Sequence, residues 1–256
     1  MNLHRSALPT LILVLGVAVA GACATTTAPP SAAPPTASRT SAPVAGCWVA
    51  TRGEYRIQPF DGAAVNATDV EDTARIVQQR LASLGLVEYE VSVGEGGTVV
   101  VLLPAMPEDA LLEARQLITP AGIAAFVPIP DGESVESGDS LPSGLTPLFG
   151  HAAIGDARAG EDETGRAAVD ITLTDAGRMR LAAFTRENVG STLAITLDGT
   201  VLTAPTIVAA IESGTMQVSG VEDASQLATI LSLPPLIGPL DEITFTEVER
   251  PAGCPV

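Results

Sequence analysis

The segment from Leu193 to Ala204, LAITLDGTVLTA, predicts a β-hairpin from local sequence alone. Its Asp198-Gly199 pair is typical of a two-residue type I′ turn between two strands. Such a turn places Ile195 opposite Leu202, and one face then carries Leu193, Ile195, Leu197, Leu202 and Ala204. We expect this apolar face to meet a core. The small, half-polar opposite face is either a partner-contact surface or a second packed face; it consists of Ala194, Thr196, Val201 and Thr203.

Residues 68–84 have the clearest helical periodicity in the chain. Thr68 and Glu71 fit a capping box at the start of this helix, and Gly85 is placed to end it. The apolar residues recur at spacings of three and four and so form one stripe, which consists of Val70, Ala74, Val77, Leu81 and Leu84.

The residues around this helix predict further strands and a second helix, in the order of a known supersecondary motif. Strands are expected at 52–60, 87–93, 98–103 and 122–129, where apolar and β-branched residues alternate or cluster. A second helix is expected from Pro107, a residue suited to a first helical turn, to about Ile118. The order β-α-β-β-α-β is that of a ferredoxin-like domain, which we assign to residues 47–129.

Residues 130–165 interrupt this regular pattern with Gly, Pro, Ser and acidic residues. Calcium binding is one interpretation of these acids, but the Asp-x-Asp-x-Asp-Gly spacing is absent, which favours a solvated, flexible insertion. Regular structure is expected again from 167 onward, with strands at 169–173, 215–219 and 243–248 and helices at 174–188 and 222–233. The predicted fold class is therefore α+β.

The first 23 residues resemble a bacterial secretory signal that ends in a lipobox. Arg5 precedes the apolar stretch 11–20, which is shorter than the ~20 residues of a membrane helix. Small residues then lead to Cys23, the candidate lipidation site; simple cleavage before an unmodified Cys23 is the alternative. Residues 24–46 are rich in Ala, Thr, Ser and Pro, and we expect a disordered tether there.

Two further cysteines flank the folded part of the chain. Cys47 opens this part and Cys254 lies two residues before the C-terminus. An oxidising compartment favours a disulfide between Cys47 and Cys254, and two unpaired thiols are the alternative. A zinc site is not expected, because no Cys-x-x-Cys is present and His151 is the one histidine that follows the signal.

Charge and composition argue against several classes of function. The chain has 30 acidic and 13 basic residues, a net charge of −17, and no lysine. Nucleic-acid binding needs clustered positive charge, and P-loop and Schiff-base chemistries need a lysine. No G-x-S-x-G elbow is present, and His151 lies in the insertion, where a surface role is expected. We therefore predict no enzyme activity, no cofactor, no metal and no nucleic-acid partner, although paired carboxylates leave glycosidase chemistry formally open.

Two blocks of this sequence resemble the extracytoplasmic P1 domain of the SecD protein-export subunit. The first is RIVQQRLASLGLVEYEV at 75–91, followed by TVVVLLPAMPED. The second, more specific block runs from Ile171 to Gly220 and includes TRENVGSTLAITLDGTVLTAP. Val218 stands where the family usually has Ile. The resemblance covers roughly residues 65–250.

This resemblance implies a two-part architecture. A ferredoxin-like base would comprise residues 47–129 and the returning helix and strand at 221–256, with an inserted α+β head at 130–220 that contains the hairpin. SecD proteins continue into transmembrane helices linked to proton-driven export. This sequence stops at Val256, so no motor activity is expected.

The resemblance implies a binding role rather than catalysis. We expect a module that a lipid on Cys23 anchors outside the bacterial cell membrane, and that contacts exported polypeptides or the Sec translocase. The alternative is an envelope interaction or structural lipoprotein that uses the same fold for another partner, because a fold does not fix a function.

Overall fold

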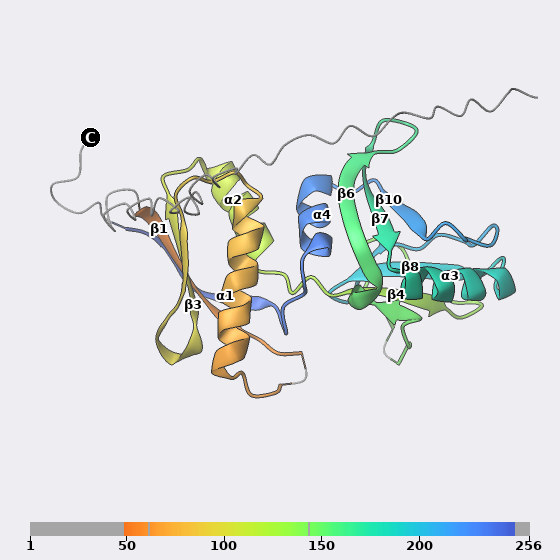
Figure 1. The fold of residues 1–256 in the computed structure, drawn as a ribbon, viewed down its shortest axis with the longest axis horizontal. Helices are drawn as coiled ribbons and strands as arrows, with labels where there is room; N and C mark the ends of the chain where they lie inside the picture. Colours follow the sequence, from red (N-terminus) through yellow and green to blue (C-terminus); the bar gives the residue numbers. More distant parts are fainter. Residues whose placement is uncertain (1–48, 61, 143, 249–256) are drawn as a thin grey trace, which may run out of the picture. The chain divides into compact units, whose positions relative to one another are not determined.

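The computed structural model describes residues 49–60, 62–142 and 144–248, and these form three antiparallel sheets and four α-helices (Figure 1). The predicted α+β class is confirmed. The predicted signal, tether and all three cysteines lie outside the described residues. Among the described residues, no helix combines the length and the apolar character needed to cross a membrane.

The first sheet has the ferredoxin-like strand order β11-β1-β3-β2. The six elements that build this base follow one another as β1 (Val49–Ile57), α1 (Ala67–Ala82), β2 (Glu90–Val93), β3 (Val99–Pro104), α2 (Glu108–Ile118) and β11 (Leu240–Glu247), and a short 3₁₀ turn (Glu95–Gly97) joins β2 to β3. The core that joins the helices to the sheet includes Tyr55, Val77, Leu81, Val99 and Ile118, all fully buried.

Strand β11 supplies the last strand of the base, although it follows α2 by more than 120 residues. It pairs with β1, opposing Thr51 with Glu247 at one end and Ile57 with Leu240 at the other. The Arg115 guanidinium of α2 donates to both carboxylate oxygens of Glu242 at 2.9 and 2.8 Å, and it lies 4.8 Å from the ring centre of Phe245. This bidentate pair fixes the returning strand against α2.

The N-cap of helix α1 lies two residues before the predicted one. Asn66 is the N-cap: its side chain accepts from the Asp69 amide at 3.1 Å, and the Asp69 carboxylate accepts from the Asn66 amide at 2.9 Å. The prediction of Thr68 and Glu71 was therefore wrong, because the equivalent Asn-x-x-Asp pair completes the same reciprocal box one half-turn earlier. The predicted stripe is buried from Val70 to Leu81.

The strand predicted as the last of the base belongs to another sheet. Strand β4 (Ala124–Ile129) lies in the order β5-β4-β8-β9, with β5 (Phe149–Gly150), β8 (Thr192–Leu197) and β9 (Thr200–Thr203). It pairs with β8 so that Phe126 opposes Ile195. Its alternating burial predicts a strand correctly, but periodicity carries no information about the partner strand.

The third sheet, β10-β7-β6, contains a strand that the amino-acid composition did not predict. Strand β6 (Ile154–Glu161) falls within the predicted insertion and pairs with β7 (Ala167–Leu173), which in turn pairs with β10 (Thr215–Ser219). Most of β6 is exposed and only Ala157 is buried, so no apolar alternation marks it. A second 3₁₀ turn (His151–Ala153) precedes it.

Two helices complete the part of the chain between α2 and β11. Helix α3 (Asp175–Glu187) follows β7, and α4 (Ala224–Ser232) packs against β6 and β7. Leu227 and Leu231 of α4 share a core with Phe126, Ile171 and Leu181. The returning segment therefore completes the base with β11 alone, whereas we predicted that its helix would also belong there.

Candidate functional site

The predicted contact face of the β8–β9 hairpin is buried. Ala194, Thr196 and Val201 are 0%, 1% and 1% exposed, and Thr203 is half-buried. The Thr196 hydroxyl donates to the Ala125 carbonyl at 3.3 Å. The segment 138–141 hydrogen-bonds along β9, accepting from the Val201 amide through the Asp139 carbonyl at 2.8 Å. Three of the four side chains of this face are therefore buried, which favours the second packed face over a partner-contact surface, and Thr203 alone keeps partial exposure.

The turn itself is as predicted, but the register beyond it is not. Asp198 and Gly199 both have positive φ, 51° and 83°, as a type I′ turn requires. Thr196 opposes Val201 as expected, and a bulge then places Ile195 opposite Thr203 instead of Leu202. The bulge adds one residue on β9, and a turn dipeptide cannot predict it.

The other face of the hairpin lines a groove of about 650 Å³. Leu197 and Leu202 are half-buried there, beside the end of α2 and the start of α4. The apolar lining consists of Pro120, Leu197, Leu202, Val221, Leu227 and Ile230, and the polar lining of Gln116, Thr119, Ser137, Glu222, Asp223 and Gln226. Its volume lies within the range of typical ligand clefts.

Two carboxylates lie beside the apolar part of this groove. Glu222 is exposed, and Asp223 is half-buried and caps α4 by accepting from the Gln226 amide at 2.8 Å. No arginine lines the groove, and neither carboxylate forms an ion pair with another described residue. The groove therefore combines apolar walls with uncompensated negative charge.

Arg80 lies fully buried in α1, beside the segment that leads from α2 to β4. Its guanidinium donates to the carbonyls of Leu117 at 3.1 Å, Pro120 at 2.5 Å and Ala121 at 2.9 Å. Burial lowers the pKa of Arg80 to about 10, and the negative charge of Asp198 opposes this shift. One side chain thus donates to three carbonyls, of which that of Ala121 also accepts from the Leu236 amide at 2.9 Å.

Asp198 holds the same segment from the other side, and His151 bonds to the chain just after α4. The Asp198 carboxylate accepts from the amides of Gly122 at 3.0 Å and Ile123 at 2.8 Å. His151 Nε2 lies 2.9 Å from the Leu233 carbonyl, which fits a donor at that nitrogen. We call Arg80, Asp198 and His151 the junction cluster, because they fix the chain where it leaves the base and where α4 ends.

Gly122 is required at the centre of this cluster. Its φ is +82°, and a Cβ there would lie 2.7 Å from Ile230 Cγ2 and 2.8 Å from the Arg80 guanidinium.

Burial lowers the pKa of His151, and the neighbouring Arg80 lowers it further, whereas the Leu233 and Gly122 backbone and Asp198 oppose this. The neutral imidazole is therefore the form that the folded protein favours.

Sequence reasoning missed all three junction residues as a group. His151 was assigned to a solvated loop, and Asp198 was assigned to the turn alone. Arg80 offered a weak signal, because it follows Val77 by three residues and so falls on the edge of the apolar stripe of α1.

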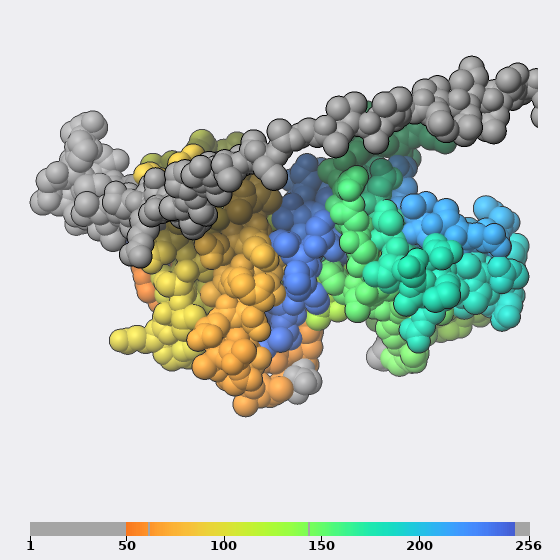
Figure 2. Space-filling model, viewed as in Figure 1, coloured from red at the N-terminus to blue at the C-terminus, as the bar shows by residue number. Residues whose placement is uncertain are grey.

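A second cleft of about 420 Å³ is lined mainly by α1, β6 and α4. In the space-filling view its lining elements appear where the orange surface of α1 meets the blue surface of α4 (Figure 2). Small and hydroxyl-bearing residues predominate, among them Ser83, Ser225, Thr229 and Ser232. The Ser232 hydroxyl donates to the Ala157 carbonyl of β6 at 2.9 Å, so part of this polar lining is already used internally.

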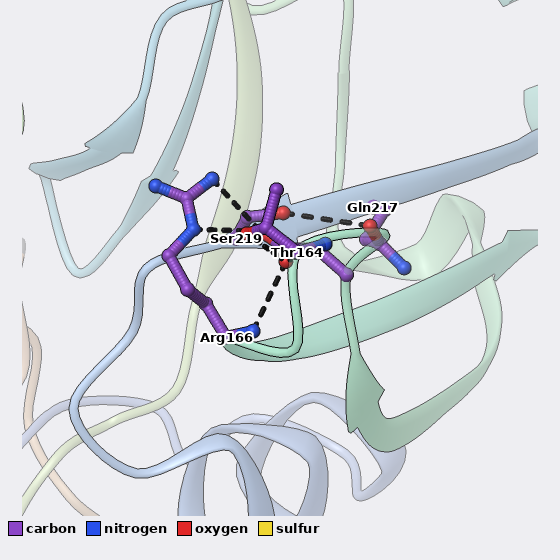
Figure 3. A network of polar contacts seen from close by, with 5 residues as sticks. Thr164, Arg166, Gln217 and Ser219 are labelled. Atoms are coloured by element: carbon purple, nitrogen blue, oxygen red, sulfur yellow. Dashed lines mark hydrogen bonds and ion pairs between the residues drawn. The ribbon is translucent and has the colours of Figure 1, made fainter.

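The turn between β6 and β7 is a self-contained polar network (Figure 3). The Asp162 carboxylate accepts from the Thr164 hydroxyl at 2.7 Å and from the Arg166 guanidinium at 2.9 Å, and these hydrogen bonds lower the pKa of Asp162. Gln217 and Ser219 of β10 lie nearby and bond to each other. The acids of this predicted insertion thus order a turn, and no metal-binding group of His, Cys, Asp or Glu occurs among the described residues.

A family model matches the second half of the chain. The family model described as SecDF, P1 head subdomain, matches residues 136–237. The protein translocase subunit SecDF of Thermus thermophilus is 31% identical over 194 residues, which cover 65% of this chain and 26% of that protein. SecDF of Brucella abortus is 31% identical over 205 residues, covering 70% and 27%. SecD of Dictyoglomus turgidum is 27% identical over 211 residues, covering 79% and 48%.

Solved structures extend the similarity to the base. A crystal structure of SecDF in a super-membrane-facing form has a TM-score of 0.69 at 26% identity, over 79% of this chain and 30% of that one. A second chain, from a study of SecDF as a membrane component that enhances protein export, has a TM-score of 0.64 at 27% identity, over 75% of this chain and 98% of that one. The chain spans between about a quarter and a half of the length of the curated relatives named above. Its described residues have the P1 fold, base and head, and over this region the chain is similar in sequence to the SecD and SecDF proteins.

Proposed function

We propose that this chain is an extracytoplasmic module of protein export that binds extended segments of exported polypeptides in the groove beside the β8–β9 hairpin. Similarity to the protein translocase subunits SecD and SecDF supports the role in export. The groove supports the mode of contact, and it is the observation on which the proposal rests. Leu197, Leu202 and Leu227 provide apolar contacts, while the adjacent amides and hydroxyls can meet a peptide backbone.

The expected affinity is low. A surface that accepts many unfolded chains cannot complement any one of them closely, and each bound chain loses conformational entropy on ordering. We therefore expect dissociation constants in the micromolar range or weaker, roughly −8 kcal/mol or less favourable.

The test is a binding measurement with the full chain and a fluorescent, reduced secretory polypeptide kept unfolded. Leu202→Asp places a charge on the apolar wall and should weaken binding at least about tenfold. Val208→Asp is the matched control, since Val208 is 86% exposed and does not line the groove. Circular dichroism checks that both variants fold. If Leu202→Asp does not fold, Gln226→Arg at the rim of the groove replaces it as the blocking variant.

Two outcomes would contradict this proposal. If the wild type binds no unfolded polypeptide, the chain serves another partner, as in the envelope-lipoprotein alternative or a contact confined to the Sec translocase. If Leu202→Asp, Gln226→Arg and Val208→Asp all bind as the wild type does, the contact lies outside the groove.

We also propose that the domain is held outside the cell membrane by a lipid on Cys23. The small residues before Cys23 and the Pro-rich stretch after it support this. Stable anchoring needs more than one acyl chain, which a diacylated cysteine provides. Cys23→Ala should move the protein from the membrane fraction to the soluble fraction. A variant that stays in the membrane fraction, with no fatty-acid label on the wild type, would contradict the anchor.

A further inference from the structure

We infer that the groove prefers polypeptide segments in which an apolar side chain is flanked by Arg or Lys. This inference rests on the proposed function and specifies its ligand class. It starts from the charge of the groove rather than from its shape. Two carboxylates, on Glu222 and Asp223, lie at the wall that also holds Val221 and Leu227.

The carboxylates are available to a ligand. Neither forms an ion pair with a described arginine, and Asp223 uses one oxygen, at 2.8 Å, on the Gln226 amide. Glu222 is exposed, so it can meet a cation without the desolvation cost that burial brings. A carboxylate that caps a helix keeps further acceptor sites on its oxygens.

The spacing of apolar and acidic groups suits an extended chain. Successive residues of an extended polypeptide are about 3.3 Å apart and their side chains alternate in direction. An apolar side chain that enters between Leu202 and Leu227 therefore leaves its neighbours at the rim. A guanidinium or ammonium there meets Glu222 or Asp223, whereas a carboxylate there meets charge of the same sign.

The rest of the molecule adds to this preference without explaining it. A chain with a net charge of −17 and no lysine attracts cationic segments over the Debye length, about 8–10 Å at physiological salt. That general attraction is not tied to the groove. A specific role for Glu222 and Asp223 therefore requires a control that changes net charge equally elsewhere.

The experiment compares three fluorescent peptides that share one apolar core and differ in flanking residues, which are Arg, Gln or Glu. With the full-length wild type we expect the Arg peptide to bind roughly five- to tenfold more tightly than the Gln peptide, and the Glu peptide more weakly than both. The Arg advantage should shrink as salt rises. Glu222→Gln with Asp223→Asn should remove most of it, and Asn at 223 still caps α4.

The matched control is Asp131→Asn with Glu163→Gln, which removes the same two charges from exposed positions that do not line the groove. If the groove and control double variants lower the Arg preference equally, the preference comes from net charge and the inference is wrong. If all three peptides bind the wild type alike, the inference is wrong while polypeptide binding stands. If none of the three binds, both the inference and the proposed function fail.

Discussion

The Thr185 hydroxyl joins α3 to the loop that follows β9, because it accepts a hydrogen bond from the Ile211 amide at 2.9 Å. The same hydroxyl donates to the Leu181 carbonyl at 2.8 Å, and the Thr185 side chain is fully buried. Arg186 and Glu212 form an ion pair at 3.0 Å beside it, but both are exposed, and such pairs contribute little. Backbone hydrogen bonds hold Pro205, Ile207 and Gly214 at the two ends of this loop, and the buried hydroxyl is the main side-chain attachment of residues 208–213 between them.

Thr185→Val should loosen residues 208–213 of this loop while leaving the fold intact. The substitution keeps the shape of the side chain but leaves the Ile211 amide without its acceptor, at a cost of about 1–2 kcal/mol. Hydrogen exchange should show the faster exchange confined to this loop. Thr185→Ser, which keeps the hydroxyl, should exchange like the wild type; equal protection in Thr185→Val would show that the bond does not hold the loop.

Arg80→Met should destabilise the protein by about 3 kcal/mol or more. The methionine fills similar volume, but the carbonyls of Leu117 and Pro120 lose the guanidinium as a donor, and the Ala121 carbonyl keeps only the Leu236 amide. Urea denaturation measures the free energy of unfolding. Arg80→Lys should cost less than Arg80→Met, since it keeps the charge but not the planar fork that reaches several acceptors. A Met variant as stable as the wild type would mean that water or relaxation satisfies these carbonyls.

His151 should make stability depend on pH below neutrality. Burial lowers its pKa in the folded state, so the unfolded chain, with a pKa of about 6.5, takes up the proton first as the pH falls. The free energy of unfolding therefore decreases as pH falls through about 6.5 and continues to decrease until the folded pKa is reached. Arg80 and Asp198 are the charged groups that face this imidazole.

His151→Gln is the matching variant, because its amide can donate to the Leu233 carbonyl but does not titrate. The difference in unfolding free energy between wild type and variant, measured between about pH 7.5 and about pH 5, isolates this one group from the acids that also titrate. The wild type should lose stability relative to the variant at the acidic end. Parallel pH curves would mean that His151 binds its proton equally well in both states.

The sequence of this protein predicts short-range structure well and long-range assignment poorly. Asp198-Gly199 predicts its turn because positive φ is a local requirement. The partner of β4 depends instead on which of two strands, β1 or the more distant β8, lies beside it, and both fit the same alternation. Alternation likewise does not show which face of the hairpin is exposed. Residues 138–141 decide between the two faces by covering β9, and nothing in their composition indicates it.

The candidate site was predictable only in part. Leu197 and Leu202 were assigned to the core-facing side, and they are half-buried there, yet the groove that they line exists because α2, α4 and Ser137 surround them. Glu222 and Asp223 are ordinary helix-start residues in the sequence, where acids are favoured by the helix dipole. Their position beside an apolar wall is a property of the folded chain.

The start of β1 pairs with the end of β11, which supports the expectation of a disulfide between Cys47 and Cys254. Thr51 of β1 opposes Glu247 of β11, and the Val248 amide donates to the Ala50 carbonyl at 2.8 Å. Both cysteines lie outside the described residues, a few positions beyond these strand ends. A bond between them would close a loop of about two hundred residues and stabilise the domain by up to roughly 5 kcal/mol in the loop-entropy model.

Non-reducing peptide mapping of the exported protein should recover the linked pair, and the double variant Cys47→Ser with Cys254→Ser should unfold at a lower urea concentration than the wild type. Reductant should lower the stability of the wild type and leave that double variant unchanged. Two free thiols in the exported protein, or a reductant effect that persists in the double variant, would contradict the bond.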